Sequence, residues 1–241
     1  MKLPGSWKIP EVIQNRLGQK SVGKQRAMIA EGHLLLILHH VPKPNEKERQ
    51  GVFFWRDPQE KWQSSHGGMG LQPLRKHLQA YDEEVNQLSA EYEKAQQAED
   101  YFQLLEDLAP LRLATQNLHF ALQSAREGIP DDRDIIDLRD SAYEIERSLN
   151  LLHDNMKNAL DYRIAQRAEQ QTKISLESVR MSNRLNILVA IFFPLTATSC
   201  VFGMNLNSGI SSSSILAFWF ILIVSISLGL VVRRWIVTGK L

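Results

Sequence analysis

Residues 185–204 read LNILVAIFFPLTATSCVFGM and contain no charged side chain. A bilayer's hydrocarbon core is about 30 Å thick, and a helix that rises about 1.5 Å per residue needs about 20 apolar residues to cross it. A second uncharged segment, residues 215–232, is followed by Arg233, Arg234 and Trp235, which is typical of a helix that stops at lipid headgroups. The sequence therefore predicts two membrane-spanning helices rather than two buried core helices.

Basic residues next to these segments predict their orientation. The residues concerned are Arg180, Arg184, Arg233, Arg234 and Lys240, whereas the connecting residues 205–214 carry no charge. Because Lys and Arg gather in cytoplasmic loops, we expect both termini in the cytoplasm, an external loop at 205–214 and a basic cytoplasmic tail at 233–241. The N-terminus lacks the apolar core of a secretory signal, so the C-terminal pair is expected to insert the chain into the inner (plasma) membrane.

Composition narrows the function of the remaining chain. The 241 residues include 28 Lys and Arg against 27 Asp and Glu, which gives no argument for a nucleic-acid partner. Cys200 is the only cysteine, so neither an intramolecular disulfide nor a thiolate zinc cluster can form. The sequence contains no Gly-rich phosphate loop ending in Gly-Lys-Ser/Thr, no His-Glu-x-x-His and no Gly-x-Ser-x-Gly. We therefore expect a protein that is not an enzyme and uses no organic cofactor.

Residues 1–72 are predicted to form a small α+β cytoplasmic domain. The expected elements are a short helix at residues 11–17 and antiparallel strands at 26–30, 33–41, 52–56 and 61–64. The adjacent His39 and His40 would point to opposite faces of their strand, so their rings are not expected to bind one ion. His66 lies in a glycine-rich linker, for which no function is predicted.

Helices are expected from residue 73 onward. Residues 73–130 show apolar side chains at spacings of three and four, with an interruption or kink predicted at Pro110. Asp131 or Asp132 is placed to cap the next helix. Because no proline or glycine follows until Pro194, we expect a stalk at residues 131–184 that continues into the membrane. Counted from Asp131 to Phe202, the whole helix has about 72 residues and a length of roughly 108 Å, too long for one small domain.

The end of the first apolar segment carries the most specific motif. Phe202-Gly203-Met204-Asn205 resembles the aromatic-Gly-Met-Asn motif of the CorA family of divalent-cation channels, and it stands between a long charged helix and a second apolar segment. The resemblance covers residues 130–241 well and residues 1–71 poorly. It implies a mainly α membrane protein, with a small α+β N-terminal domain, that assembles as a homopentamer in lipid.

The resemblance also implies site residues. Gly203, Met204 and Asn205 would form the selectivity filter, in which neutral amides grip Mg²⁺ that keeps its water. Aligned on the same motif, one face of the first membrane helix corresponds to the pore lining: Val179, Ser182, Leu185, Val189, Phe193, Thr196 and Cys200. By periodicity alone, ordinary helix packing explains this row equally well.

Gating in the family uses intracellular Mg²⁺ bound between neighbouring subunits by acidic residues. Asp137, Asp140 and Glu144, at spacings of three and four, resemble the stalk part of such a regulatory metal site. The alternative is a solvated acidic face that pairs with Arg133, Arg139 or Arg147.

Three features depart from the family pattern. Residues 206–214 lack the usual acidic residue, Cys200 and Phe193 replace a usual glycine and methionine, and the N-terminal part is short. We expect a passive channel for divalent cations, most simply Mg²⁺, driven by the membrane potential. The alternatives are a Zn²⁺, Co²⁺ or Ni²⁺ transporter of the same family and a non-conducting, membrane-anchored helical scaffold.

Overall fold

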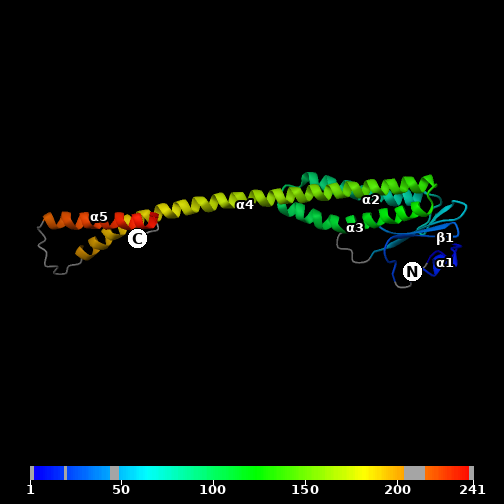
Figure 1. The fold of residues 1–241 in the computed structure, drawn as a ribbon, viewed down its shortest axis with the longest axis horizontal. Coiled ribbons are helices and arrows are strands. Elements are labelled where there is room, and N and C mark those ends of the chain that lie inside the picture. The colour runs from blue at the N-terminus through cyan, green and yellow to red at the C-terminus, as the bar shows by residue number, and fades with distance from the viewer. Residues whose placement is uncertain (1–2, 19–20, 44–48, 204–214, 239–241) are drawn as a thin grey trace. The chain divides into compact units, whose positions relative to one another are not determined.

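The computed structural model describes residues 3–18, 21–43, 49–203 and 215–238. The chain separates into two compact units, Met1–Ala165 and Gln166–Leu241. Its elements are helix α1 (Glu11–Gln14), strands β1 (Arg26–Ala30), β2 (His33–His39), β3 (Gly51–Arg56) and β4 (Trp62–Ser64), and helices α2 (Gln72–Lys94), α3 (Ala98–Gly128), α4 (Arg133–Gly203) and α5 (Ile215–Thr238) (Figure 1). The predicted fold class is confirmed: a small antiparallel sheet precedes a mainly helical chain, in which one long helix runs into a C-terminal apolar region.

The sheet has the order β1-β2-β3-β4, and each neighbouring pair is antiparallel. Leu34, Leu36 and Leu38 of β2 belong to the core shared with the helices, whereas Leu35 and Ile37 face a smaller core with the N-terminal segment. Because both faces are covered, an unbroken apolar run forms this strand. The four expected strands are confirmed, but α1 is shorter than residues 11–17, since the chain continues beyond Gln14 as turns.

The first break between helices lies at residues 95–97. Ala95 has an extended backbone, with φ −66° and ψ 134°, and Gln97 begins α3 in a capping box with Asp100. The Asp100 carboxylate accepts hydrogen bonds from the backbone N–H groups of Gln97 and Gln96 at 2.8 and 3.0 Å, which lower its pKa. Capping therefore determines where α3 starts.

Of the interruption or kink predicted at Pro110, the interruption is wrong. Pro110 lies inside α3, where it removes one backbone hydrogen bond. Leu108 and Leu111 on either side of it are fully buried, as are Leu118 and Leu122 further along the same helix. Burial of this apolar face stabilises the helix enough to offset the missing bond.

The start of α4 agrees with the predicted cap. One carboxylate oxygen of Asp132 accepts a hydrogen bond from the backbone N–H of Ile135 at 3.2 Å. The other lies 2.7 Å from the Arg56 guanidinium, and the two side chains are only 12% and 6% exposed. Asp132 therefore caps α4 and also forms a buried ion pair with Arg56, which joins β3 to α4.

The first part of α4 belongs to the core of the N-terminal unit. Its buried apolar residues are Ile135, Leu138, Ala142, Ile145, Leu149, Leu152 and Met156. Residues 167–186 of the same helix are exposed throughout. The predicted stalk thus contains a packed segment followed by a polar segment that meets water or other subunits.

Candidate functional site

Two segments of the described residues are long and apolar enough to cross a bilayer, judged by length and composition. One lies in α4 and the other is Phe218–Trp235 in α5, with mean hydropathies of 2.0 and 1.7. Only 6% and 11% of their most apolar 18-residue windows are buried within the chain. A core helix of a soluble protein would be largely buried, so this exposure favours contact with lipid or with other subunits.

Helices α4 and α5 pack against each other through small residues. A Cβ atom on Gly229 would lie 2.9 Å from the carbonyl oxygen of Ile191, so the helices approach too closely for any larger residue. The Thr198 and Ser225 hydroxyl oxygens lie 3.0 Å apart, and Ala190 is also buried. This contact identifies the face of α4 that α5 occupies. It was not predicted from the sequence.

The predicted pore-lining residues lie on the other side of α4. At 3.6 residues per turn, the row from Leu185 to Cys200 is about half a turn around the helix from Ala190, Pro194 and Thr198. All seven residues of the row are exposed in the single chain: Val179, Ser182, Leu185, Val189, Phe193, Thr196 and Cys200. The packing of α5 therefore leaves the row accessible to a second copy or to water, and its role as a pore lining stays a prediction.

The predicted selectivity filter lies only partly within the described residues. Gly203 is the last residue of α4, whereas Met204, Asn205 and the predicted loop 205–214 lie outside them. A Cβ atom on Gly203 would meet no atom within 4 Å. Among the described residues, packing within one chain therefore does not explain glycine at this position.

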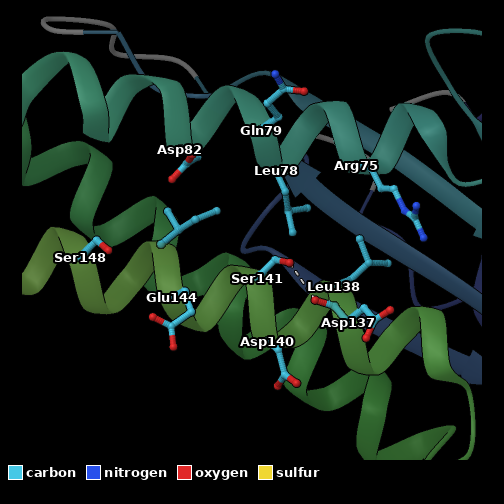
Figure 2. A pocket seen from close by; sticks show the side chains of 11 residues that line it. Arg75, Leu78, Gln79, Asp82, Asp137, Leu138, Asp140, Ser141, Glu144 and Ser148 are labelled. Atoms are coloured by element: carbon cyan, nitrogen blue, oxygen red, sulfur yellow. Dashed lines mark hydrogen bonds between the residues drawn. The ribbon is translucent and has the colours of Figure 1, made fainter.

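The three predicted regulatory carboxylates line one groove between α2 and α4, together with Asp82 and Arg75. Figure 2 shows that Asp82 points toward α4, whereas Asp140 and Glu144 point away from α2. Each of these two carboxylates pairs with an arginine of its own helix: Asp140 with Arg139 at 3.0 Å and Glu144 with Arg147 at 3.3 Å.

These pairs agree with the solvated acidic face considered as the alternative. Asp137, the third carboxylate, makes no ion pair within the described residues. No three His, Cys, Asp or Glu side chains in this part of the chain are already arranged to hold a metal ion. A regulatory ion here would thus need ligands from a neighbouring copy, and the site stays a prediction.

The expectation that His39 and His40 diverge is confirmed. His39 Nε2 lies 2.8 Å from the carbonyl oxygen of Gly23, and burial lowers the pKa of His39. The His40 ring instead meets the rings of His66 and His77, with centroids 5.1 and 6.1 Å away. Sequence reasoning missed this cluster because its members come from separate elements, and no periodicity links them.

His77 is the buried member of this cluster. Burial, and secondarily the nearby His40, lower its pKa to about 4, although a backbone hydrogen bond to His39 acts in the opposite direction. The ring is therefore neutral at pH 7.

Comparison with known proteins assigns the chain to a family. The family model described as "CorA-like Mg2+ transporter protein" matches residues 70–237. The chain belongs to this family. The match includes both apolar helices and begins where the sheet ends, which agrees with the poor resemblance noted for residues 1–71.

A solved structure agrees at the level of the fold. The chain is 15% identical to the full-length CmaX protein, with a TM-score of 0.57, and 96% of this chain and 83% of that chain are covered. It is 16% identical to the CorA magnesium transporter from Methanocaldococcus jannaschii, with a TM-score of 0.37, and 92% of this chain and 81% of that chain are covered. No relative was found among curated proteins. As a CorA-like protein, the chain is a membrane protein of a divalent-cation transporter family.

Proposed function

We propose that this CorA-like protein is a passive channel for hydrated Mg²⁺ that assembles from several copies, five by resemblance to the family. The family match over residues 70–237 carries the proposal. Two membrane helices cannot enclose a water-filled path, so conduction requires several copies around a common axis. The uncovered row on α4 supports this arrangement, because it is the face that α5 leaves accessible.

The chemistry of that row suits a hydrated cation. Thr196 Oγ1 donates its hydrogen to the carbonyl oxygen of Phe192 at 2.8 Å, so the lone pairs of the hydroxyl oxygen stay available as acceptors. A hydrated cation presents water hydrogens outward, and these can donate to such an oxygen. Leu185 and Phe193 on the same row would form apolar constrictions that gate by dewetting.

Selection is proposed at Gly203, Met204 and Asn205. Mg²⁺ gives up its water reluctantly, so a ring of Asn205 amides would recognise the hydration shell rather than the bare ion. A ring of carboxylates would bind the dication too tightly to release it, whereas a ring of neutral amides would not. With both termini in the cytoplasm, as the flanking basic residues indicate, an inside-negative potential contributes about 4.6 kcal/mol per 100 mV to inward movement of a dication.

Regulation by intracellular Mg²⁺ is part of the proposal. Asp137, Asp140 and Glu144 would contribute ligands from one copy, and a neighbouring copy would complete the site. Bound Mg²⁺ would neutralise carboxylates that otherwise repel one another, and so hold the ring closed. If Asp140→Ala leaves uptake equally sensitive to internal Mg²⁺, this part of the proposal is wrong.

Flux into proteoliposomes tests conduction. Uptake of Mg²⁺, Zn²⁺, Co²⁺ and Ni²⁺ is measured with internal fluorescent indicators under an inside-negative potential, for wild type, Asn205→Ala and the control Asn207→Ala. We expect Mg²⁺ uptake that Asn205→Ala reduces at least tenfold and Asn207→Ala leaves intact. Uptake of only the transition metals would favour the alternative transporter, and background flux in all three proteins would favour the scaffold.

A further inference from the structure

Three histidines from distant parts of the chain meet beside the sheet in the N-terminal unit. His40 directly follows β2, His66 lies in the turn after β4, and His77 lies on α2. The His40 and His66 rings are perpendicular, with centroids 5.1 Å apart, and the His40 and His77 centroids are 6.1 Å apart. All three side chains line one groove with a volume of about 590 Å³. The folded sheet and α2 thus concentrate imidazole nitrogens in a small space.

The buried member of this group has a nitrogen atom without a partner. His77 is 8% exposed, and its Nε2 makes no hydrogen bond. Leaving a buried polar atom unsatisfied costs about 1–3 kcal/mol, so such an atom calls for an explanation. Phe54 and Tyr81 pack against the ring with centroids 5.5 Å away, which holds it at the wall of the groove. A ligand that accepts the lone pair of Nε2 would satisfy this atom.

We propose that His40, His66 and His77 bind one transition-metal dication of the class of Zn²⁺, Co²⁺ and Ni²⁺, with water in the fourth position. Neutral imidazole nitrogen suits these ions, whereas Mg²⁺ prefers oxygen. Zn–N bonds are about 2 Å long, which places two imidazole rings on one tetrahedral ion with centres about 5 Å apart. The separation of 5.1 Å between His40 and His66 agrees with this value, whereas the separation of 6.1 Å between His40 and His77 is about 1 Å longer. Three histidines with an open fourth position form a common zinc site.

Closing the site requires side-chain rotation. The described residues do not hold three ligands already in a coordinating arrangement. His66 is exposed and precedes Gly67 and Gly68, whose φ angles are +86° and +87°, and its Nδ1 contacts the Ser65 hydroxyl at 3.0 Å. His40 is also exposed, whereas His77 is fixed by burial. The proposed site therefore requires both exposed rings to rotate toward His77 Nε2.

No acidic residue is among the described residues that line the groove, so the protein ligands would be the three neutral imidazoles. Lys76 also lines the groove, but its side chain is exposed and can extend into solvent. His39 takes no part, because its ring contacts Gly23 on the other face of the strand. The site does not rest on the proposed channel function, and binding can be measured without transport.

Metal titration of the purified, tag-free full-length protein in detergent tests the proposal. After removal of metal with a chelator, Zn²⁺ is titrated in competition with a fluorescent zinc indicator, and Co²⁺ binding is followed by its visible absorption. We expect one Zn²⁺ per chain, at least tenfold weaker binding in His40→Ala and in His66→Ala, and no competition from millimolar Mg²⁺. Because His66 lies on an exposed turn, His66→Ala tests the site without disturbing the core.

His153→Ala is the matched control, since His153 lies on α4 outside the groove. It should bind Zn²⁺ as wild type does, and the Co²⁺ spectrum of a tetrahedral nitrogen site should disappear only in the groove variants. The proposal is overturned if wild type binds no more tightly than the His40→Ala/His66→Ala double variant. It is also overturned if His153→Ala weakens binding as much as His66→Ala.

Discussion

Replacing Gly229 by valine tests how closely α4 and α5 pack. A Cβ atom at residue 229 would lie 2.9 Å from the carbonyl oxygen and 3.1 Å from the Cα atom of Ile191. Because both are backbone atoms, the helices must separate, which lengthens the 3.0 Å contact between Thr198 and Ser225. Overpacking costs about 1–3 kcal/mol, and a hydrogen bond between membrane helices contributes about 0.6 kcal/mol. The better helix propensity of valine offsets less than about 1 kcal/mol, so we expect a net loss of about 1–3 kcal/mol.

Unfolding in mixed micelles measures this loss. Sodium dodecyl sulfate is titrated into the detergent-solubilised protein, and the fluorescence of Trp219 and Trp235 on α5 reports the separation of the helices. Gly203→Val is the control, because a Cβ at that position meets no atom within 4 Å. Equal stability of Gly229→Val and wild type, or an equal loss in Gly203→Val, would refute the described packing.

Three further predictions concern single side chains. Asp132→Ala should lower the stability of the N-terminal unit by about 1–3 kcal/mol, because the buried Arg56 loses its buried partner and keeps only the exposed Glu60 at 3.2 Å. Asp134→Ala breaks the half-exposed ion pair with Arg75 and should cost less than about 1 kcal/mol. Denaturant titration measures both variants, and similar losses of stability would contradict the difference expected between a buried and an exposed ion pair. The pKa of His77 is lowered from 6.5 to about 4, so the unfolded chain binds more protons than the folded chain between these two pH values. The free energy of unfolding should therefore fall by up to about 3 kcal/mol as the pH falls from about 6.5 to about 4. Melting at a series of pH values checks this, and His77→Gln should flatten the profile; an unchanged slope in the variant would rule His77 out as the cause. Thr196→Val should lower Mg²⁺ uptake several-fold in the proteoliposome assay. The control Thr172→Val loses a similar hydrogen bond from its hydroxyl to the carbonyl oxygen of Ala168 and should leave uptake unchanged. Equal effects of the two substitutions would contradict a polar contact between Thr196 and the hydrated ion.

Much of the fold could be predicted because its signals are local. The uncharged runs at 185–204 and 215–232 give the apolar helices by length alone, and Asp132 after Gly128-Ile129-Pro130 gives the start of α4. The error at Pro110 has the opposite origin. Proline disfavours a helix locally, but burial of Leu108 and Leu111 depends on tertiary contacts that the sequence does not display.

The candidate site, too, could be predicted from the sequence only where its signals are local. Spacing placed the row from Leu185 to Cys200 on one face of α4, but only the structure shows that α5 occupies the other face. A strand end, a turn and a helix must pack together to bring His40, His66 and His77 close to one another. The order of residues in the sequence does not predict this packing. The motif at Gly203 was found by resemblance, since the physical chemistry of one copy gives no reason for that glycine.

The bond between Thr198 and Ser225 bears on how the protein is made. Each hydroxyl finds a partner within its own chain, so a newly synthesised copy brings the two together without waiting for a sister chain. Biogenesis can then proceed in two stages, with a self-sufficient hairpin entering the lipid first and the hairpins gathering afterwards by lateral diffusion.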